Sequence, residues 1–278
     1  MVADPSGALA DALVLLDPAH GLVIPLDDPR FAATESGRRS AEIEAWTVAK
    51  IKRIGADAVK LLVWYRPDQD AASRAHQEDL VQRTGAACAR YDIPFLLELR
   101  VYPFPGAAAA GVDDAVAPRE RADLVLASVE RFAGADFGVD LFALESPLPA
   151  AEVPAPEGAG HAVDTCRALF DELGRRAGRP WVVRSAGATA PAFRHIVAHA
   201  CHAGASGHLA GRAVWWDGFE AFPDLALMHQ ALATGASDTM RELDALADRH
   251  ARPWTDWYGE PLPAGWDSPC FPRDYPSF

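Results

Sequence analysis

The segment Gly204-Ala-Ser-Gly-His-Leu-Ala-Gly-Arg-Ala-Val-Trp215 indicates the fold most directly. It is typical of a short buried strand whose carboxyl end presents Gly211 and Arg212. Upstream, Pro180-Trp-Val-Val-Arg-Ser-Ala-Gly187 is a second strand pattern that also ends in a turn of small residues. Strand ends of this kind, with exposed backbone N–H groups and one arginine, hold phosphate in the last two loops of a (β/α)8 barrel. The two segments therefore predict a barrel that binds a phosphorylated small molecule.

Apolar runs alternate with helical stretches along the rest of the chain. The runs expected to be strands cover residues 12–17, 22–26, 58–65, 94–102, 140–148, 181–185 and 208–215. Most are continuous rather than alternating, as expected where helices cover both faces of a parallel sheet or the outside of a barrel. The order predicts an α/β fold of the TIM (β/α)8 type over residues 1–250. Residues 251–278 form a tail rich in proline and aromatic residues, expected to pack on the barrel or at a subunit contact.

Local signals place helices and loops between these strands. A helix is expected over residues 40–53, with Ser40 as its N-cap, Glu42 and Glu44 in its first turn and Gly55 as its stop. A second helical stripe consists of Leu80, Thr84, Ala87 and Tyr91. Residues 103–118 and 149–161 are rich in proline, alanine and glycine and are expected to be loops at the rim. The tail is not expected to stay helical beyond about Tyr258.

Composition limits the partners. The formal net charge of −13 argues against a nucleic-acid reader, which usually presents a basic face. No apolar run approaches the ~18 residues needed to span a membrane. The first residues have neither a basic nor an apolar signal region, so we expect a cytoplasmic protein. The four cysteines have no CxxC spacing and are expected to be buried thiols.

Three charged residues interrupt apolar strands. Lys60, Glu98 and Glu145 each stand in an otherwise apolar run, where a charge is costly unless it is paired or functional. Arg100 shares the face of Glu98 through the two-residue strand period. If the strands bring these side chains together at the mouth of the barrel, they form either a neutralised structural network or a proton shuttle with an amine.

A metal site is not expected. His195, His199 and His202 have helical spacing, but no nearby carboxylate completes a ligand set, and the pattern is more typical of one side of a helix. The sequence therefore predicts neither a metal nor another cofactor.

The chain resembles the class I aldolases of the tagatose-bisphosphate and sulfofructose-phosphate group. The segments that carry the resemblance keep their order over roughly residues 10–245 and are Leu15-Leu-Asp-Pro-Ala-His-Gly21, Gly55-Ala-Asp-Ala-Val-Lys-Leu-Leu-Val63, Pro94-Phe-Leu-Leu-Glu-Leu99, Val139-Asp-Leu-Phe-Ala-Leu-Glu-Ser-Pro147 and the two segments quoted first. The run after Lys60 is more similar to the sulfosugar branch. The resemblance implies a barrel that cleaves a ketose phosphate to dihydroxyacetone phosphate and an aldehyde, without a metal, and a homo-oligomer is expected for such barrels.

The resemblance also implies roles for particular residues. Lys60 and Glu98 become active-site polar residues, and Glu145 flanks the imine. The residues expected to hold the phosphate are Ser185, Gly187, Gly211 and Arg212. Arg184 and Arg100 are additional cations that either bind a second anion or neutralise Glu98 and Glu145.

Two departures from the family matter. The imine-forming lysine of the family lies two residues before the glutamate of the sixth barrel strand, and here that position is Ala143. Lys60 is then the only lysine on an expected strand. The chain also lacks the family's N-terminal strand with its Asp-Gln-Arg loop, and six or seven strands do not close an eight-stranded barrel. Either the chain is truncated, another chain or an irregular segment fills the gap, or the barrel is open.

Three functions follow from these patterns. The first is an aldolase-type lyase for a phosphorylated or sulfonated sugar, with Lys60 as a nucleophile or as an electrostatic substitute. The second is an imine-free isomerase, epimerase or decarboxylase, with Glu98 or Glu145 as general base. The third is a sugar-phosphate-binding homologue without catalysis.

Overall fold

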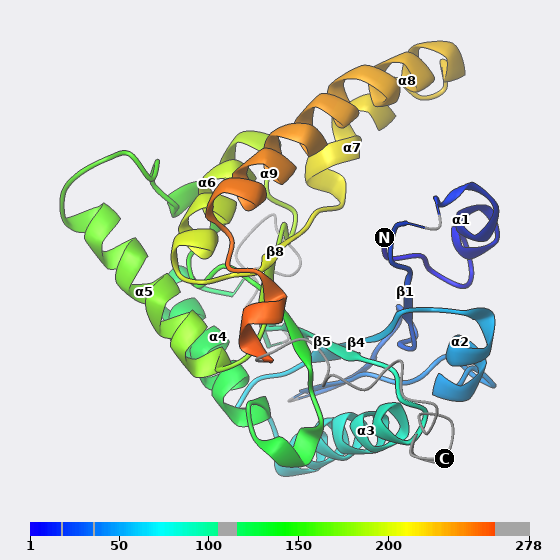
Figure 1. Ribbon diagram of the computed structural model, residues 1–278. Helices are drawn as coiled ribbons and strands as arrows, with labels where there is room; N and C mark the ends of the chain where they lie inside the picture. The colour runs from blue at the N-terminus through cyan, green and yellow to red at the C-terminus, as the bar shows by residue number, and fades with distance from the viewer. Residues whose placement is uncertain (18, 36, 105–115, 259–278) are drawn as a thin grey trace, which may run out of the picture.

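A six-stranded parallel sheet forms the centre of the computed structural model, which describes residues 1–17, 19–35, 37–104 and 116–258 (Figure 1). Its strands are β1 (Val23–Pro25), β4 (Ala58–Trp64), β5 (Phe95–Arg100), β6 (Leu141–Leu144), β7 (Trp181–Arg184) and β8 (Gly207–Leu209). They lie in the order β1-β4-β5-β6-β7-β8. The six strands thus follow one another in the sheet in chain order, with the separate strands β2 and β3 between β1 and β4, as in a (β/α) barrel and unlike a doubly wound sheet.

The sheet is open among the described residues. β1 and β8 are its two edges, and Val2 adds an isolated parallel bridge to Val23 at the β1 edge. The fold is therefore a partial barrel of the expected α/β type. The strand positions expected at 22–26, 58–65, 94–102, 140–148 and 181–185 are confirmed, although each observed strand is shorter.

The two faces of the sheet differ in character. One face is fully buried and apolar, with Val59, Leu61 and Val63 on β4 and Phe95 and Leu97 on β5. The helices α3 (Ala71–Arg90), α4 (Pro118–Phe132), α5 (His161–Ala177) and α6 (Ala190–His202) lie along the outside, where α5 packs on α4 and α6 on α5 (Figure 1). The other face carries the charged strand residues. The stripe Leu80, Thr84, Ala87 and Tyr91 faces the core from α3, as expected.

Two local expectations were wrong. Residues 12–17 lie largely in helix α1 (Leu9–Leu15) rather than in a strand, because this alanine- and leucine-rich stretch has high helix propensity and buries one side through Leu9 and Ala12. The helix expected from residue 40 is α2 (Val48–Ile54), which is capped by Thr47 and ends at Gly55. Ser40 is instead buried, and its hydroxyl accepts a hydrogen bond from the backbone of Trp64.

The strand expected over residues 208–215 stops at Leu209. Gly211 then caps helix α7 (Arg212–Phe219), which is followed by α8 (Leu225–Ala231), a π-helical turn at Leu232–Ala236 and α9 (Ser237–His250). The segments α8, Leu232–Ala236 and α9 run on as one long helix that extends away from the sheet, with α7 packed along it, while α9 also packs on α6 (Figure 1). A small hairpin of β2 (Ala32–Thr34) and β3 (Gly37–Arg39) precedes α2.

Short 3-10 turns are also present among the described residues. The 3-10 turns are Ala135–Phe137, Ala150–Glu152 and Trp254–Trp257. The last one ends the described chain, where the Tyr258 hydroxyl donates to the Asp140 carbonyl at 2.7 Å. Residues 105–115 of the expected rim loop and the aromatic tail after Tyr258, including Cys270, lie outside the described residues. Among those that are described, no helix has the length and apolarity that a membrane crossing requires.

Candidate active site and anion pocket

The polar residues of the inner strands form one continuous ionic cluster. The Lys60 ammonium lies 2.8 Å from Glu98 Oε2 and 3.2 Å from Asp27 Oδ1. All three residues are buried, with Lys60 only 6% exposed. Asp27 also accepts a hydrogen bond at 3.0 Å from the Leu62 amide, which aligns it with β4. The prediction that Lys60 and Glu98 lie close together is therefore correct, but the sequence did not predict Asp27 as a member of the cluster.

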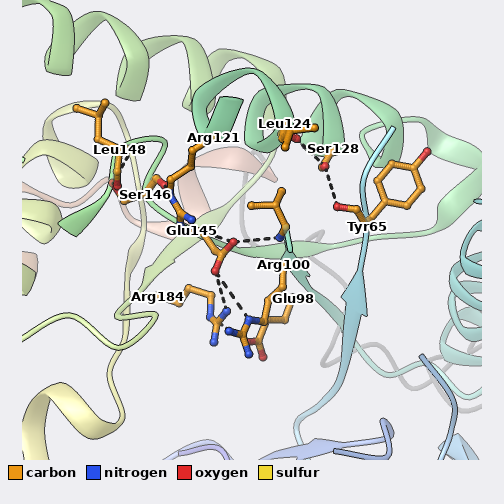
Figure 2. A network of polar contacts seen from close by, with 11 residues as sticks. Tyr65, Glu98, Arg100, Arg121, Leu124, Ser128, Glu145, Ser146, Leu148 and Arg184 are labelled. Atoms are coloured by element: carbon orange, nitrogen blue, oxygen red, sulfur yellow. Dashed lines mark hydrogen bonds and ion pairs between the residues drawn. The ribbon is translucent and has the colours of Figure 1, made fainter. Parts of the chain in front are cut away.

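Arg184 extends this cluster to the next carboxylate. Its Nε lies 2.8 Å from Glu98 Oε1 and its Nη1 lies 3.4 Å from Glu145 Oε1. Figure 2 shows the Arg184 and Arg100 side chains converging on Glu145 from β7 and β5. Arg100 is 3.8 Å from Oε1, and Arg121 of α4 is 3.7 Å from Oε2. The Val101 amide also donates to Glu145 at 3.1 Å. Lys60, Glu98 and Glu145 thus belong to one ionic cluster, in which Arg184 links the two carboxylates.

Burial and charge act against each other within this cluster. Burial alone lowers the pKa of a lysine, but for Lys60 the carboxylates of Glu98 and Asp27 outweigh burial and hold the pKa above its usual value. Burial raises the pKa of Asp27 despite the nearby ammonium. For Glu98, burial is outweighed by Arg184 and Lys60, which lower its pKa to about 2. At neutral pH the cluster therefore holds Lys60 as an ammonium and Glu98 as a carboxylate.

This arrangement predicts an acid-dependent loss of stability. Glu98 has a folded-state pKa of about 2 against the usual 4.5, so its contribution is complete above about pH 4.5 and is lost as the pH falls towards 2. We expect the free energy of unfolding to fall more steeply over this range in the native chain than in Glu98→Gln. Urea unfolding at stepped pH values measures the two slopes. Equal slopes would contradict the lowered pKa of Glu98 in the folded protein.

Ala143 lies on β6, on the face of the sheet that carries the charged residues. It pairs in register with Glu98 on β5 and with Val182 on β7, and it lies two residues before Glu145. Because side chains alternate along a strand, Ala143 and Glu145 point to the same face. Ala143 is fully buried, and its methyl group offers no nitrogen.

A pocket of about 320 Å³ lies at the carboxyl ends of β7 and β8. It is lined by Arg100, Arg184, Ser185, Ala186, Gly187, Leu209, Ala210, Gly211, Arg212 and Trp215. All six residues expected to bind an anion therefore line one pocket. Arg184 and Arg100 also contact Glu145, so the pocket adjoins the ionic cluster. The residues Lys60, Glu98, Glu145 and Ala143 are not among those that line it. The sequence did not predict Trp215 as a lining residue. It lies at the pocket because β8 ends at Leu209 and the chain continues into α7.

The loop after β7 has an unusual backbone. Ala186 and Gly187 both have positive φ, at 48° and 85°. The first is uncommon for a residue with a side chain and marks a strained turn, a feature that concentrates at binding sites. A Cβ added to Gly187 would lie 3.7 Å from Arg212 Nη2, so this turn lies directly beside the guanidinium. The loop after β7 and the start of α7 thus lie side by side in the lining of the pocket.

Two of the α6 histidines lie within hydrogen-bond distance of backbone carbonyls. His199 Nε2 is 3.0 Å from the Pro154 oxygen, and His202 Nδ1 is 2.7 Å from that of Ala198. Within the part of the chain that the structure describes, no three His, Cys, Asp or Glu side chains gather as metal ligands. Cys88, Cys166 and Cys201 are buried free thiols, and burial raises the pKa of Cys88 to about 12.

A sequentially wound parallel sheet, with charges on its inner face and an anion pocket beyond its last two strands, is the architecture of the (β/α)-barrel enzymes. The sequence model of the family described as "DeoC/LacD family aldolase" matches residues 6–217. The chain belongs to this family of aldolases, which are carbon–carbon lyases. The family expected from the sequence is thus confirmed.

Individual relatives agree with this assignment. The chain is 31% identical over 245 residues to a tagatose 1,6-diphosphate aldolase of Listeria monocytogenes, covering 86% of this chain and 72% of the relative. It is 29% identical over 266 residues to that of Streptococcus pneumoniae, covering 92% and 79%.

Solved structures support the fold. An archaeal fructose 1,6-bisphosphate aldolase is similar with a TM-score of 0.53 at 15% identity, over 85% of this chain and 77% of that one. The fructose-bisphosphate aldolase of Plasmodium falciparum has a TM-score of 0.60 at 11% identity, over 84% and 70%.

Proposed function

We propose that this protein is an aldolase-type lyase that binds a phosphorylated sugar in the pocket beyond β7 and β8 and cleaves it without an imine. The observation that carries the proposal is the position of Arg184. This residue lines the anion pocket and also contacts both buried carboxylates of the cluster, Glu98 and Glu145. A sugar held in the pocket by its phosphate therefore lies beside charged groups that can act on its carbonyl and hydroxyl groups.

The phosphate end of the substrate is assigned to the cradle of Ser185, Gly187, Gly211 and Arg212. Gly211 caps α7, so the first N–H groups of this helix are available to an anion, and Arg212 adds a charge-assisted donor. This is the chemistry by which barrel enzymes hold phosphate. A sulfonate is also a tetrahedral oxyanion, with a single negative charge, and is the second candidate for the anionic group.

An imine at Lys60 is not part of the proposal. A nucleophilic lysine needs a neutral amine, and enzymes obtain one by lowering the lysine pKa. Here the pKa of Lys60 is raised by two carboxylates, and its ammonium lies between Glu98 and Asp27. By its resemblance to the family, Ala143 stands where the lysine is expected. We therefore assign Lys60 an electrostatic role, as the counter-ion that keeps Glu98 ionised and Arg184 in position.

The cleavage step then uses the cations of the cluster. A base takes the proton from the hydroxyl that is β to the sugar carbonyl, the carbon–carbon bond breaks, and its electron pair moves onto the carbonyl oxygen as an enolate. Arg184 and Arg100 stabilise that oxyanion, and the enolate carbon then takes a proton. We assign the proton transfers to Glu145, because this carboxylate contacts both Arg184 and Arg100, which line the pocket.

One observation favours a second function, which is binding without catalysis. Each carboxylate of the cluster already has a cationic partner, and such neutralised networks are also built for stability alone. Release of triose phosphates from tagatose 1,6-bisphosphate separates the two functions, because a binding protein shows affinity without turnover. Solvent deuterium exchange without cleavage would instead indicate an imine-free isomerase or epimerase. We also propose that the protein is a cytoplasmic homo-oligomer, as expected from the sequence.

Arg212 is expected to dominate anion affinity. We expect Arg212→Met to raise the Kd for inorganic phosphate at least tenfold, because a charge-assisted hydrogen bond contributes about 1.5–3 kcal/mol. Isothermal titration calorimetry measures the Kd. Arg175→Met is the control, since Arg175 is an exposed arginine of α5 that pairs with Glu172 far from the pocket. If both variants bind phosphate as tightly as the native chain does, phosphate does not bind at Arg212 in this pocket.

A further inference from the structure

The anion pocket has an apolar wall that phosphate binding does not use. Leu209, Ala210 and Trp215 line it together with the cradle residues. Trp215 lies three residues after Arg212 in α7, and residues with this spacing lie on the same side of a helix. The helix thus places a guanidinium and an indole next to each other in one pocket.

Trp215 is held in place from within its own helix. Its ring centroid is 5.7 Å from that of Trp216 and 5.7 Å from that of Phe219, in tilted and edge-on arrangements. It nevertheless remains 38% exposed. An indole that is supported by aromatic neighbours and open towards a pocket has surface left for a ligand.

We infer that Trp215 is a specificity-determining residue that packs against the carbon skeleton of a sugar whose phosphate lies at Arg212. This inference rests on the proposed function and names what the pocket recognises besides charge. An indole offers apolar area to C–H groups, and its electron-rich face disfavours an anion. The phosphate is thereby directed to Arg212 and the carbons to Trp215. The pocket then selects anionic sugars over small oxyanions, which have no carbon skeleton.

Trp216 provides a matched comparison. It is the next residue of the same helix, it is 45% exposed, and it belongs to the same aromatic group, yet it does not line the pocket. Its indole donates to Glu220 at 3.1 Å. A general effect of losing an exposed tryptophan from α7 would appear in both variants, whereas an effect on ligand selection is expected for Trp215 alone.

The test uses calorimetric titration of the full chain with two probes, dihydroxyacetone phosphate and inorganic phosphate. Dihydroxyacetone phosphate carries one phosphate on three carbons and has no bond for the lyase to cleave. For Trp215→Ala we expect the Kd for dihydroxyacetone phosphate to rise roughly tenfold and the Kd for phosphate to change less than twofold. For Trp216→Ala neither Kd changes, and Trp215→Phe is expected to lie between Trp215→Ala and the native chain.

The outcomes separate this inference from the function on which it rests. If the native chain binds dihydroxyacetone phosphate and Trp215→Ala binds it equally well, the inference is overturned and the proposed function stands. An equal loss for both probes also overturns it, since Trp215 would then only support the cradle. If the native chain binds neither probe, both the inference and the proposed function are wrong. Far-ultraviolet circular dichroism and the Tm of each variant verify the fold.

Discussion

Ala143→Lys is expected to form a borohydride-reducible adduct with dihydroxyacetone phosphate, which the native chain does not form. The new amine would start from the inner face of β6, in register with Glu98 and two residues before Glu145. Val182 and Leu141 beside it are only partly buried, so the longer side chain has a route along the inner face.

Intact-protein mass spectrometry after borohydride treatment measures this gain directly. The expected result is one covalently bound three-carbon phosphate per chain in Ala143→Lys and none in the native protein. Ala143→Met is the control, since it adds similar volume without an amine. A folded Ala143→Lys protein that stays unmodified would show that the pocket does not place a carbonyl near residue 143.

Lys60→Met is expected to lower the free energy of unfolding by about 3–5 kcal/mol. The substitution removes the cation between Asp27 and Glu98 and leaves two buried carboxylates, with Arg184 as the remaining partner of Glu98. Urea unfolding monitored by circular dichroism gives the difference. Lys52→Met is the matched control, because Lys52 is an exposed lysine whose ammonium donates to the Asp92 carbonyl.

The double variant Lys60→Met/Glu98→Gln sharpens the interpretation. If the loss arises from uncompensated charge, neutralising Glu98 recovers part of the stability, and the two substitutions are non-additive. If Lys60→Met is no less stable than Lys52→Met, the ion pairs of Lys60 do not hold the cluster together, and its electrostatic role is wrong.

The inner strands were predictable because their signals are local. A charged residue in an apolar strand run is conspicuous, so Lys60, Glu98 and Glu145 were found, and the parallel register brings them together. Gly211 and Arg212, which follow β8, were predictable from the same kind of local signal. Asp27 could have been found by the same reasoning, since it follows β1 and approaches Lys60 from the neighbouring strand.

Other features depend on tertiary context. The leucine- and alanine-rich residues 12–17 fit a strand or a helix by composition, and the helix forms because Leu9 and Ala12 bury one side. Ser40 has the chemistry of a cap, but its backbone N–H donates to the buried side-chain amide of Gln77. Its hydroxyl accepts from Trp64 at the carboxyl end of β4. The continuation of the chain into α7 at Arg212 brings Trp215 to the pocket, and an apolar run cannot reveal that change of element.

The most direct test of the central claim is a cleavage assay of the native chain combined with borohydride trapping. Tagatose 1,6-bisphosphate is supplied, triose phosphates are followed by phosphorus NMR, and the protein mass is measured after reduction. The proposal predicts that triose phosphates accumulate, that the protein mass does not change, and that borohydride does not inactivate the enzyme. A stable adduct that disappears in Lys60→Met would contradict it and make Lys60 an imine-forming nucleophile.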